Sequence, residues 1–98
     1  MGKFVQIIEY TTTRFDELNA LADEWFRTTE GKRATGWALG TSDRDRPNTY
    51  LTIVEFDSYE AAMRNNELPE TQRFAEQMTK LCDGPPTFRN LDVFREDA

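Results

Sequence analysis

Histidine is missing from the chain, and cysteine occurs once. The absence of histidine excludes Ser-His-Asp and Cys-His catalysis, histidine-ligated zinc or haem, and the side chain that most often acts as a general base near neutral pH. The single cysteine, Cys82, has no partner for an internal disulfide, which is typical of proteins in a reducing compartment. The chain is therefore not a disulfide-stapled scaffold.

Long apolar runs are also missing. The longest contain two or three residues, so no segment is long enough to cross a bilayer. Residues 1–10 contain no apolar stretch followed by a cleavage site, so no signal peptide is expected. We therefore expect a cytoplasmic protein.

Positive charge is scarcer than negative charge. The chain has 12 Lys and Arg residues against 18 Asp and Glu residues, a net charge of −6. A negative surface repels phosphate backbones and acidic membrane surfaces. We therefore expect neither nucleic acid nor a membrane as a partner.

Apolar patterning predicts four strands. The first, Lys3–Glu9, and the third, Thr49–Phe56, are apolar on both faces and are expected at the centre of a sheet. The second, at residues 33–41, is weakened by glycines, and the last, at 87–95, mixes polar and apolar residues. These two are expected at the edges.

Segments whose apolar residues recur at helical spacing lie between the predicted strands. The first helix follows the first strand and is expected to stop at Gly31. After the third strand, Asp57 is the predicted N-cap of a short helix, and Pro69 is predicted to begin a new helix that ends at Gly84. The order β-α-β-β-α-β predicts one ferredoxin-like α+β domain over residues 1–98.

Right-handed crossovers place both helical regions on one face of a four-stranded antiparallel sheet and leave the other face uncovered. The uncovered face is lined by one of two alternations: Phe4, Gln6, Ile8 and Tyr10, or Val5, Ile7 and Glu9. An apolar patch of this size calls for a partner. We expect a two-fold homodimer in which the two sheets pack face to face.

The segment Val54–Ala62, followed by Leu68–Thr71 and Phe74, resembles the third-strand and second-helix pattern of the dimeric α+β barrel superfamily typified by antibiotic biosynthesis monooxygenases. That superfamily includes cofactor-independent monooxygenases that form quinones, haem-degrading enzymes, stress-responsive barrels and muconolactone isomerases. Several members place a histidine in the second helix, where this chain has Arg64, Asn65 and Asn66. This departure argues against haem degradation.

The resemblance implies a cofactor-independent monooxygenase or isomerase that acts on a polycyclic or phenolic compound. A substrate that forms a stabilised anion reacts with oxygen itself, so the protein need only orient it, remove water from it and assist one proton transfer. Two alternatives remain open. One is a non-catalytic module of the same fold that binds a small molecule or serves an assembly, and the other is thiol chemistry at Cys82.

Two residues are candidates for substrate binding. Gln6 is polar within a central strand, so it either hydrogen-bonds a ligand carbonyl or makes a structural bond to Thr52 or across the dimer. Trp37 lies between Gly36 and Gly40 and is either a flat wall for an aromatic substrate or an interface anchor.

Three residues are candidates for catalysis. Tyr50 is the tyrosine best placed to point into a cavity. Glu55 is a candidate base for a phenolic substrate, with a salt bridge across the dimer to Arg33, Arg89 or Arg95 as the alternative. Asn65 is expected at the mouth of the cavity, where asparagine is also a common helix-ending residue.

Overall fold

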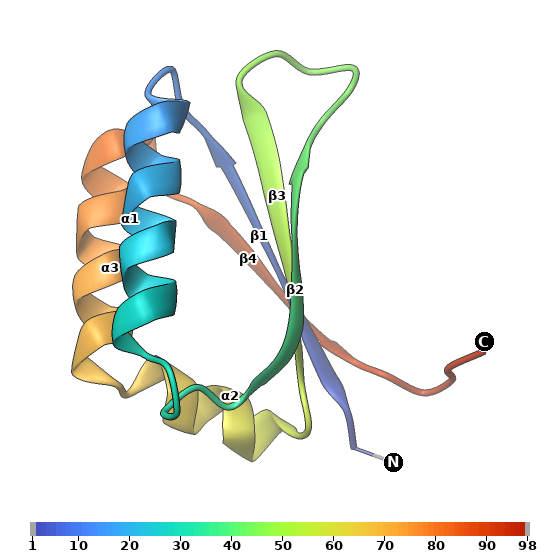
Figure 1. Ribbon diagram of the computed structural model, residues 1–98. Helices are drawn as coiled ribbons and strands as arrows, with labels where there is room; N and C mark the ends of the chain where they lie inside the picture. Colours follow the sequence, from blue (N-terminus) through green and yellow to red (C-terminus); the bar gives the residue numbers. More distant parts are fainter. Residues whose placement is uncertain (1, 98) are drawn as a thin grey trace.

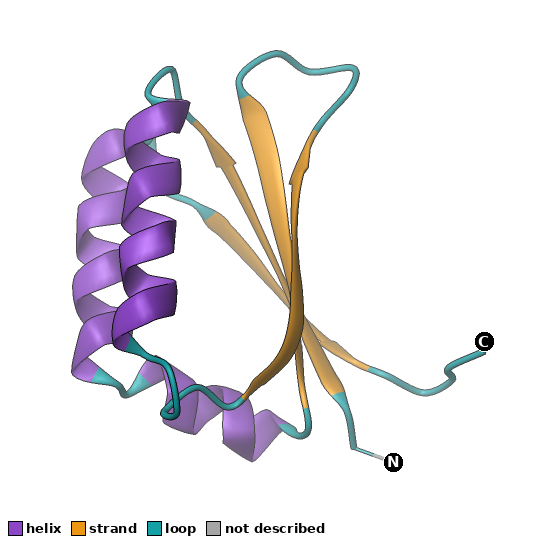
Figure 2. Cartoon of the chain, viewed as in Figure 1, coloured by secondary structure: helices purple, strands orange, loops and turns teal. Residues whose placement is uncertain are grey.

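The computed structural model describes residues 2–97, which form one sheet with helices on one face (Figure 1, Figure 2). The elements are β1 (Phe4–Thr11), α1 (Phe15–Thr28), β2 (Thr35–Ser42), β3 (Thr49–Phe56), α2 (Tyr59–Asn66), α3 (Pro69–Leu81) and β4 (Thr87–Asp92). The strands are antiparallel in the order β2-β3-β1-β4. Helices α1 and α3 lie side by side over one face, and no helix or strand of residues 2–97 covers the other (Figure 1). The predicted ferredoxin-like α+β class is confirmed.

The two strands that read as apolar on both sides occupy the centre of the sheet. β1 and β3 pair along their whole length, from Phe4 opposite Phe56 to Thr11 opposite Thr49. β2 and β4 are the edges, as their weaker patterns predict. The pairing of β2 with β3 is irregular between Thr35 and Ala38. This β-bulge places an extra residue beside the tryptophan of β2.

The second helical region is divided where the sequence predicts. α2 ends at Asn66, and Pro69 begins α3, because proline fits the first helical turn but cannot continue a helix. The predicted cap of α2 is wrong by one residue. Ser58 rather than Asp57 is the N-cap, since its extended backbone lets Oγ accept a hydrogen bond from the Ala61 N–H at 3.0 Å.

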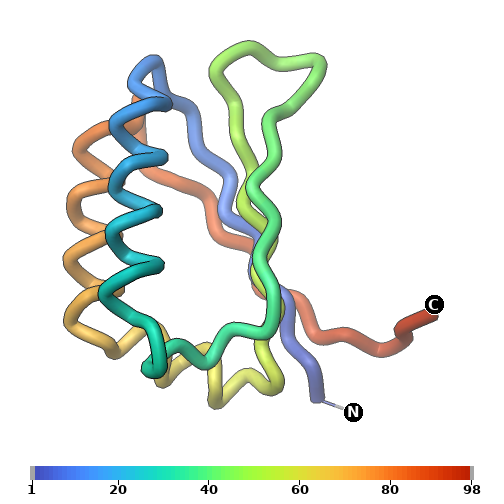
Figure 3. Tube along the Cα trace, viewed as in Figure 1, coloured from blue at the N-terminus to red at the C-terminus, as the bar shows by residue number. Residues whose placement is uncertain are grey.

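The apolar core is divided between the two ends of the sheet. At one end, Phe4 and Phe56 pack against the small residues of α2, Ala61 and Ala62. At the other, Tyr10 packs against Leu18 of α1 and Met78 of α3. Figure 3 shows α2 at one end of the sheet and the β2–β3 loop at the other. The middle of the helix-facing surface lies between these packed ends.

Thr12 joins the end of β1 to α3. Its side chain is fully buried; its hydroxyl donates to the Leu81 carbonyl at 2.6 Å and accepts from the Arg14 N–H at 2.9 Å. This contact fixes the turn that leads into α1. Over residues 2–97, no helix has the length and apolarity that a membrane span requires.

Candidate functional site

Strand register divides the five predicted site residues between the two faces of the sheet. The face that carries Phe4 and Tyr10 contacts the helices, so Gln6 and Tyr50, which lie on the same alternation, also face them. Glu55 and Trp37 lie on the opposite face. The structure therefore brings Gln6, Tyr50 and Asn65 to the helix side and does not bring Glu55 or Trp37 to them.

Between the two packed ends, two transverse rows of side chains cross the helix-facing surface; we call them the middle rows. From the β4 edge to the β2 edge, they are Asn90, Gln6, Val54 and Ala38, and then Phe88, Ile8, Thr52 and Gly40. Ile8, Thr52 and Val54 are only half-buried although they lie under the helices, and the residues at both edges are exposed. Solvent therefore reaches the middle rows between sheet and helices.

Gln6 is the most buried member of the middle rows, with 8% of its surface exposed. Its Nε2 donates to Oδ1 of Asn90, the residue opposite it on β4, at 3.1 Å. A structural hydrogen bond was one of the two predicted interpretations of Gln6. The predicted acceptor, Thr52, is wrong, because Thr52 pairs with Ile8 rather than with Gln6 in the β1–β3 register.

Aromatic rings border the middle rows at the Tyr10 end. Tyr50 stacks on Phe15 of α1 with ring centroids 4.7 Å apart and on Tyr10 with centroids 5.7 Å apart. Burial raises the pKa of the Tyr10 hydroxyl, against a smaller opposing effect of a hydrogen bond with Thr52. Tyr10 therefore stays protonated at neutral pH, so it can donate a hydrogen bond but is a poor base.

Asn65 is buried on the helix side of the sheet, at the end that α2 occupies. It lies in the last turn of α2 and is 5% exposed, and its Oδ1 accepts from the Ala34 N–H at 3.4 Å. The contact ties the α1–β2 connection to α2. The Nδ2 hydrogens are left for another acceptor, since an amide nitrogen has two donors.

Glu55 and Trp37 interact on the uncovered face. Trp37 Nε1 donates to Oε2 of Glu55 at 2.8 Å, and Lys3 Nζ lies 3.7 Å from the same oxygen. The carboxylate is almost fully buried, and it fits because residue 36 is glycine: a Cβ at Gly36 would lie 2.7 Å from Oε1. Within the described chain the cationic partner of Glu55 is Lys3. The salt bridge across a dimer to Arg33, Arg89 or Arg95 stays a prediction.

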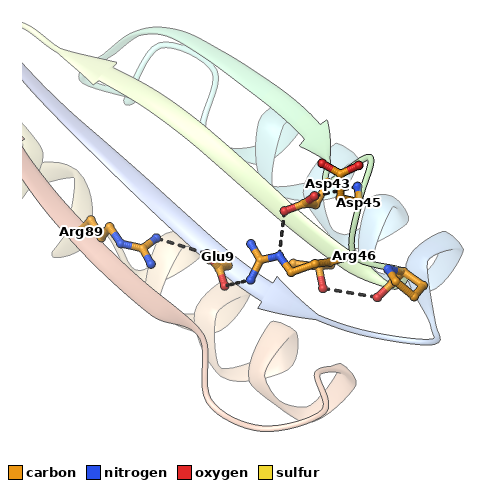
Figure 4. Close-up of polar contacts among 7 residues, drawn as sticks. Glu9, Asp43, Asp45, Arg46 and Arg89 are labelled. Carbon is orange, nitrogen blue, oxygen red and sulfur yellow. Dashed lines mark hydrogen bonds and ion pairs between the residues drawn. The ribbon is translucent and has the colours of Figure 1, made fainter.

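A second charged cluster lies at the other end of the uncovered face (Figure 4). Glu9 accepts from Arg46 of the β2–β3 loop at 3.2 Å and from Arg89 of β4 at 3.3 Å, and Arg46 also pairs with Asp43 at 2.8 Å. Hydrogen bonds from Arg46 and Arg89 lower the pKa of Glu9. Apart from these clusters and several threonines, such as Thr41 and Thr87, the paired residues of the uncovered face are apolar: Val5, Ile7, Leu39, Leu51, Ile53 and Leu91.

Sequence reasoning named Thr52 as a neighbour of Gln6 but missed Asn90 and Phe88 as members of the helix-facing surface. The face on which these residues lie follows from their pairing with Gln6 and Ile8, and the sequence of one strand does not reveal how it pairs with its neighbours. Two hollows in the surface lie elsewhere. One, of about 20 Å³, is between α1 and α3 around Trp25, and the other is at the start of α1. Within residues 2–97, no three acidic or cysteine side chains are grouped as a metal site requires.

No family model and no curated protein sequence matches the chain. Solved structures do match. A protein from Caulobacter crescentus named as an antibiotic biosynthesis monooxygenase superposes with a TM-score of 0.84 at 11% identity, over 96% of this chain and 92% of that one. A mutant of SnoaB, a cofactor-independent oxygenase from Streptomyces nogalater, gives 0.83 at 12% identity, over 98% and 97%.

Rv0793 from Mycobacterium tuberculosis gives a TM-score of 0.83 at 15% identity, over 99% of this chain and 100% of that one. The superpositions establish the fold, but sequence identities this low do not establish the reaction. The chain has the fold of the antibiotic biosynthesis monooxygenase-like proteins, as the strand and helix pattern after Val54 predicts.

Proposed function

We propose that this protein is a cofactor-independent monooxygenase that acts on a polycyclic or phenolic compound held against the middle rows. The observation that carries the proposal is the half-buried state of these rows between two packed ends, with Gln6 within them, Tyr50 at one border and Asn65 buried at the end that α2 occupies. A fold neighbour, SnoaB, is a cofactor-independent oxygenase, which supports the reaction class.

The chemistry needs no oxidant beyond O₂. A methylene group between aromatic rings and para to a carbonyl or phenolic system loses a proton to give a stabilised carbanion. A C–O bond forms with O₂; loss of water then breaks the O–O bond and leaves a carbonyl, so CH₂ and O₂ become C=O and H₂O. The substrate is oxidised and O₂ is reduced.

In this scheme the protein positions and desolvates the substrate. The Tyr10–Tyr50–Phe15 stack offers a flat aromatic wall, and Nδ2 of Asn65 donates to the oxygen that carries the developing negative charge. The proton leaves to solvent at an exposed edge of the middle rows, since Tyr10 is protonated at neutral pH and Glu55 lies on the other face.

We further propose that a second copy of the chain covers the uncovered face. Leu39, Leu91 and Trp37 are 52%, 43% and 44% exposed there, which is costly for a monomer. In such a dimer Trp37 and Glu55 belong to the interface. Sedimentation of Leu39→Asp should show monomer where the unaltered protein shows dimer; Ala38→Asp, its neighbour on the helix face, is the matched control and should remain dimeric.

The reaction is tested with dithranol, an anthrone, under air with a chelator and no flavin. Oxygen uptake and quinone absorbance should rise together above the rate without protein. Asn65→Ala should reduce kcat at least tenfold if one transition-state hydrogen bond is lost, whereas Asn66→Ala, its exposed neighbour, should not. Tyr50→Phe keeps the stack and removes only the hydroxyl, so it should retain most of the activity.

A non-catalytic binding module of the same fold is the second candidate. It is favoured by one observation: Tyr10, the buried titratable side chain at the border of the middle rows, has a raised pKa and cannot serve as a base. This candidate predicts that aromatic ligands raise the thermal midpoint of the protein while dithranol is oxidised no faster than in buffer. Accelerated quinone formation would rule it out.

A further inference from the structure

The carboxamides of Gln6 and Asn90 form half of the pairing that two such groups can make. Two antiparallel carboxamides can exchange two hydrogen bonds, each Nε2 or Nδ2 donating to the other oxygen. Here only the Gln6 Nε2 to Asn90 Oδ1 bond is present, at 3.1 Å. Within residues 2–97, Oε1 of Gln6 and Nδ2 of Asn90 make no hydrogen bond to the protein, so the two neighbouring amides keep one unused acceptor and one unused donor.

The two residues are buried to different extents, so a ligand that contacts both lies partly between sheet and helices and partly at the β4 edge. Gln6 is 8% exposed, whereas Asn90 on the edge strand is exposed. None of the described side chains has a fully buried polar atom without a partner, so Oε1 of Gln6 reaches solvent. A ligand that covers Oε1 without supplying a donor loses about 1–3 kcal/mol, whereas a ligand that supplies one avoids this loss. Phe88 lies two residues before Asn90, next to it on the same face of β4, and is 50% exposed. It offers an aromatic surface beside the pair.

We propose that Gln6 and Asn90 bind the cyclic-amide edge of a planar aromatic ligand, with the ligand N–H donating to Gln6 Oε1 and its carbonyl accepting from Asn90 Nδ2. The inference rests on the proposed function, since it places the ligand against the same middle rows. A cyclic amide holds its N–H and C=O side by side on one edge, which matches the free acceptor and donor. Phe88 stacks on the ring plane.

The test is isothermal titration of the unaltered protein with carbostyril, a bicyclic aromatic cyclic amide, and with N-methylcarbostyril, which lacks the donor. Carbostyril should bind about tenfold or more tightly than the methylated compound, because the methylated one leaves Oε1 unsatisfied. This comparison changes the ligand and needs no variant. Equal affinities, or no binding of carbostyril, would overturn the proposal.

Variants then assign the effect to the pair. Asn90→Ala should weaken carbostyril and N-methylcarbostyril alike, by about tenfold, because both keep the carbonyl that accepts from Asn90 Nδ2, while Asn66→Ala, an exposed asparagine of α2, should change neither. An unchanged carbostyril affinity in Asn90→Ala would also overturn it. Oxidation of dithranol is measured separately: turnover without carbostyril preference refutes only the ligand class, and carbostyril preference without turnover refutes only the proposed reaction.

Discussion

The close approach of Gly36 to Glu55 predicts a large effect of one added methyl group. A Cβ at residue 36 would lie 2.7 Å from Oε1 of Glu55, too close for any real contact. In Gly36→Ala the carboxylate, the end of a flexible side chain, must turn away from the new methyl group, and we expect this rotation to break the 2.8 Å bond from Trp37 Nε1 to Oε2. A hydrogen bond to a charged group contributes about 1.5–3 kcal/mol to stability.

Gly40→Ala is the matched control, since Gly40 lies in the same strand and its Cβ would meet no atom within 4 Å. Both substitutions restrict the unfolded chain equally, by about 0.4–1 kcal/mol, so this contribution cancels in their comparison. Gly36→Ala should therefore be about 1.5–3 kcal/mol less stable than Gly40→Ala in urea unfolding at one fixed protomer concentration. For a chain of this size, the thermal midpoints should differ by roughly 6–20 °C.

A double-mutant cycle separates the proposed clash from a general intolerance of side chains at residue 36. In a Glu55→Ala background no carboxylate is present, so Gly36→Ala should be as harmless as Gly40→Ala. The coupling between residues 36 and 55 should equal the gap measured between the two single variants. The reasoning is refuted if the free energies of unfolding of Gly36→Ala and Gly40→Ala differ by less than about 0.5 kcal/mol, or if their difference persists in the Glu55→Ala background.

Three further predictions concern buried polar groups. Thr12→Val should destabilise the protein by about 1–3 kcal/mol in urea unfolding, because the Leu81 carbonyl loses its donor, while exposed Thr13→Val should change stability by less than about 0.5 kcal/mol; equal effects would contradict this. Burial raises the pKa of Tyr10 above the unfolded value of 10.0, so its stability contribution is complete below pH 10.0 and is lost as pH rises through the folded pKa; Tyr10→Phe should flatten the alkaline limb of a stability profile, and an unchanged limb would count against it. Burial also raises the pKa of Cys82, so Ellman's reagent should label the native thiol more slowly at neutral pH than the urea-unfolded thiol, and rapid native labelling would revive thiol chemistry.

The order of elements was predictable because each signal is local. A two-sided apolar run such as Thr49–Phe56 is stable only at the centre of a sheet, and its bounds match β3. Pro69 cannot continue a helix, so the division of α2 from α3 follows from one residue. Edge strands were less sharply bounded. The last strand ends at Asp92 rather than at Arg95, because its pairing with β1 ends where Asp92 lies opposite Phe4.

The faces of the sheet were not predictable from the sequence. β1 is apolar on both alternations, so its pattern gives no preference for Gln6 or for Glu9 on the helix side. Contact with α2 and α3 decides between them, and these contacts join residues more than fifty positions apart. Glu55 and Trp37 consequently fall on the uncovered face, away from Gln6, Tyr50 and Asn65.

The two faces of the sheet carry polar groups of different kinds, and this difference connects the two proposals. On the uncovered face the polar groups are charged and paired with one another, as in Glu9 with Arg46 and Arg89, so the apolar strip between them is free to meet another apolar surface. On the helix face they are neutral amides with unused hydrogen-bonding capacity, as in Gln6 and Asn65. Paired charges beside apolar residues suit association with a second copy, whereas neutral amides with a spare donor or acceptor in a half-buried layer suit a small planar ligand. A substitution on one face should therefore leave the function of the other face intact. We expect Leu39→Asp to abolish dimerisation without preventing ligand binding, and Asn90→Ala to weaken ligand binding without preventing dimerisation.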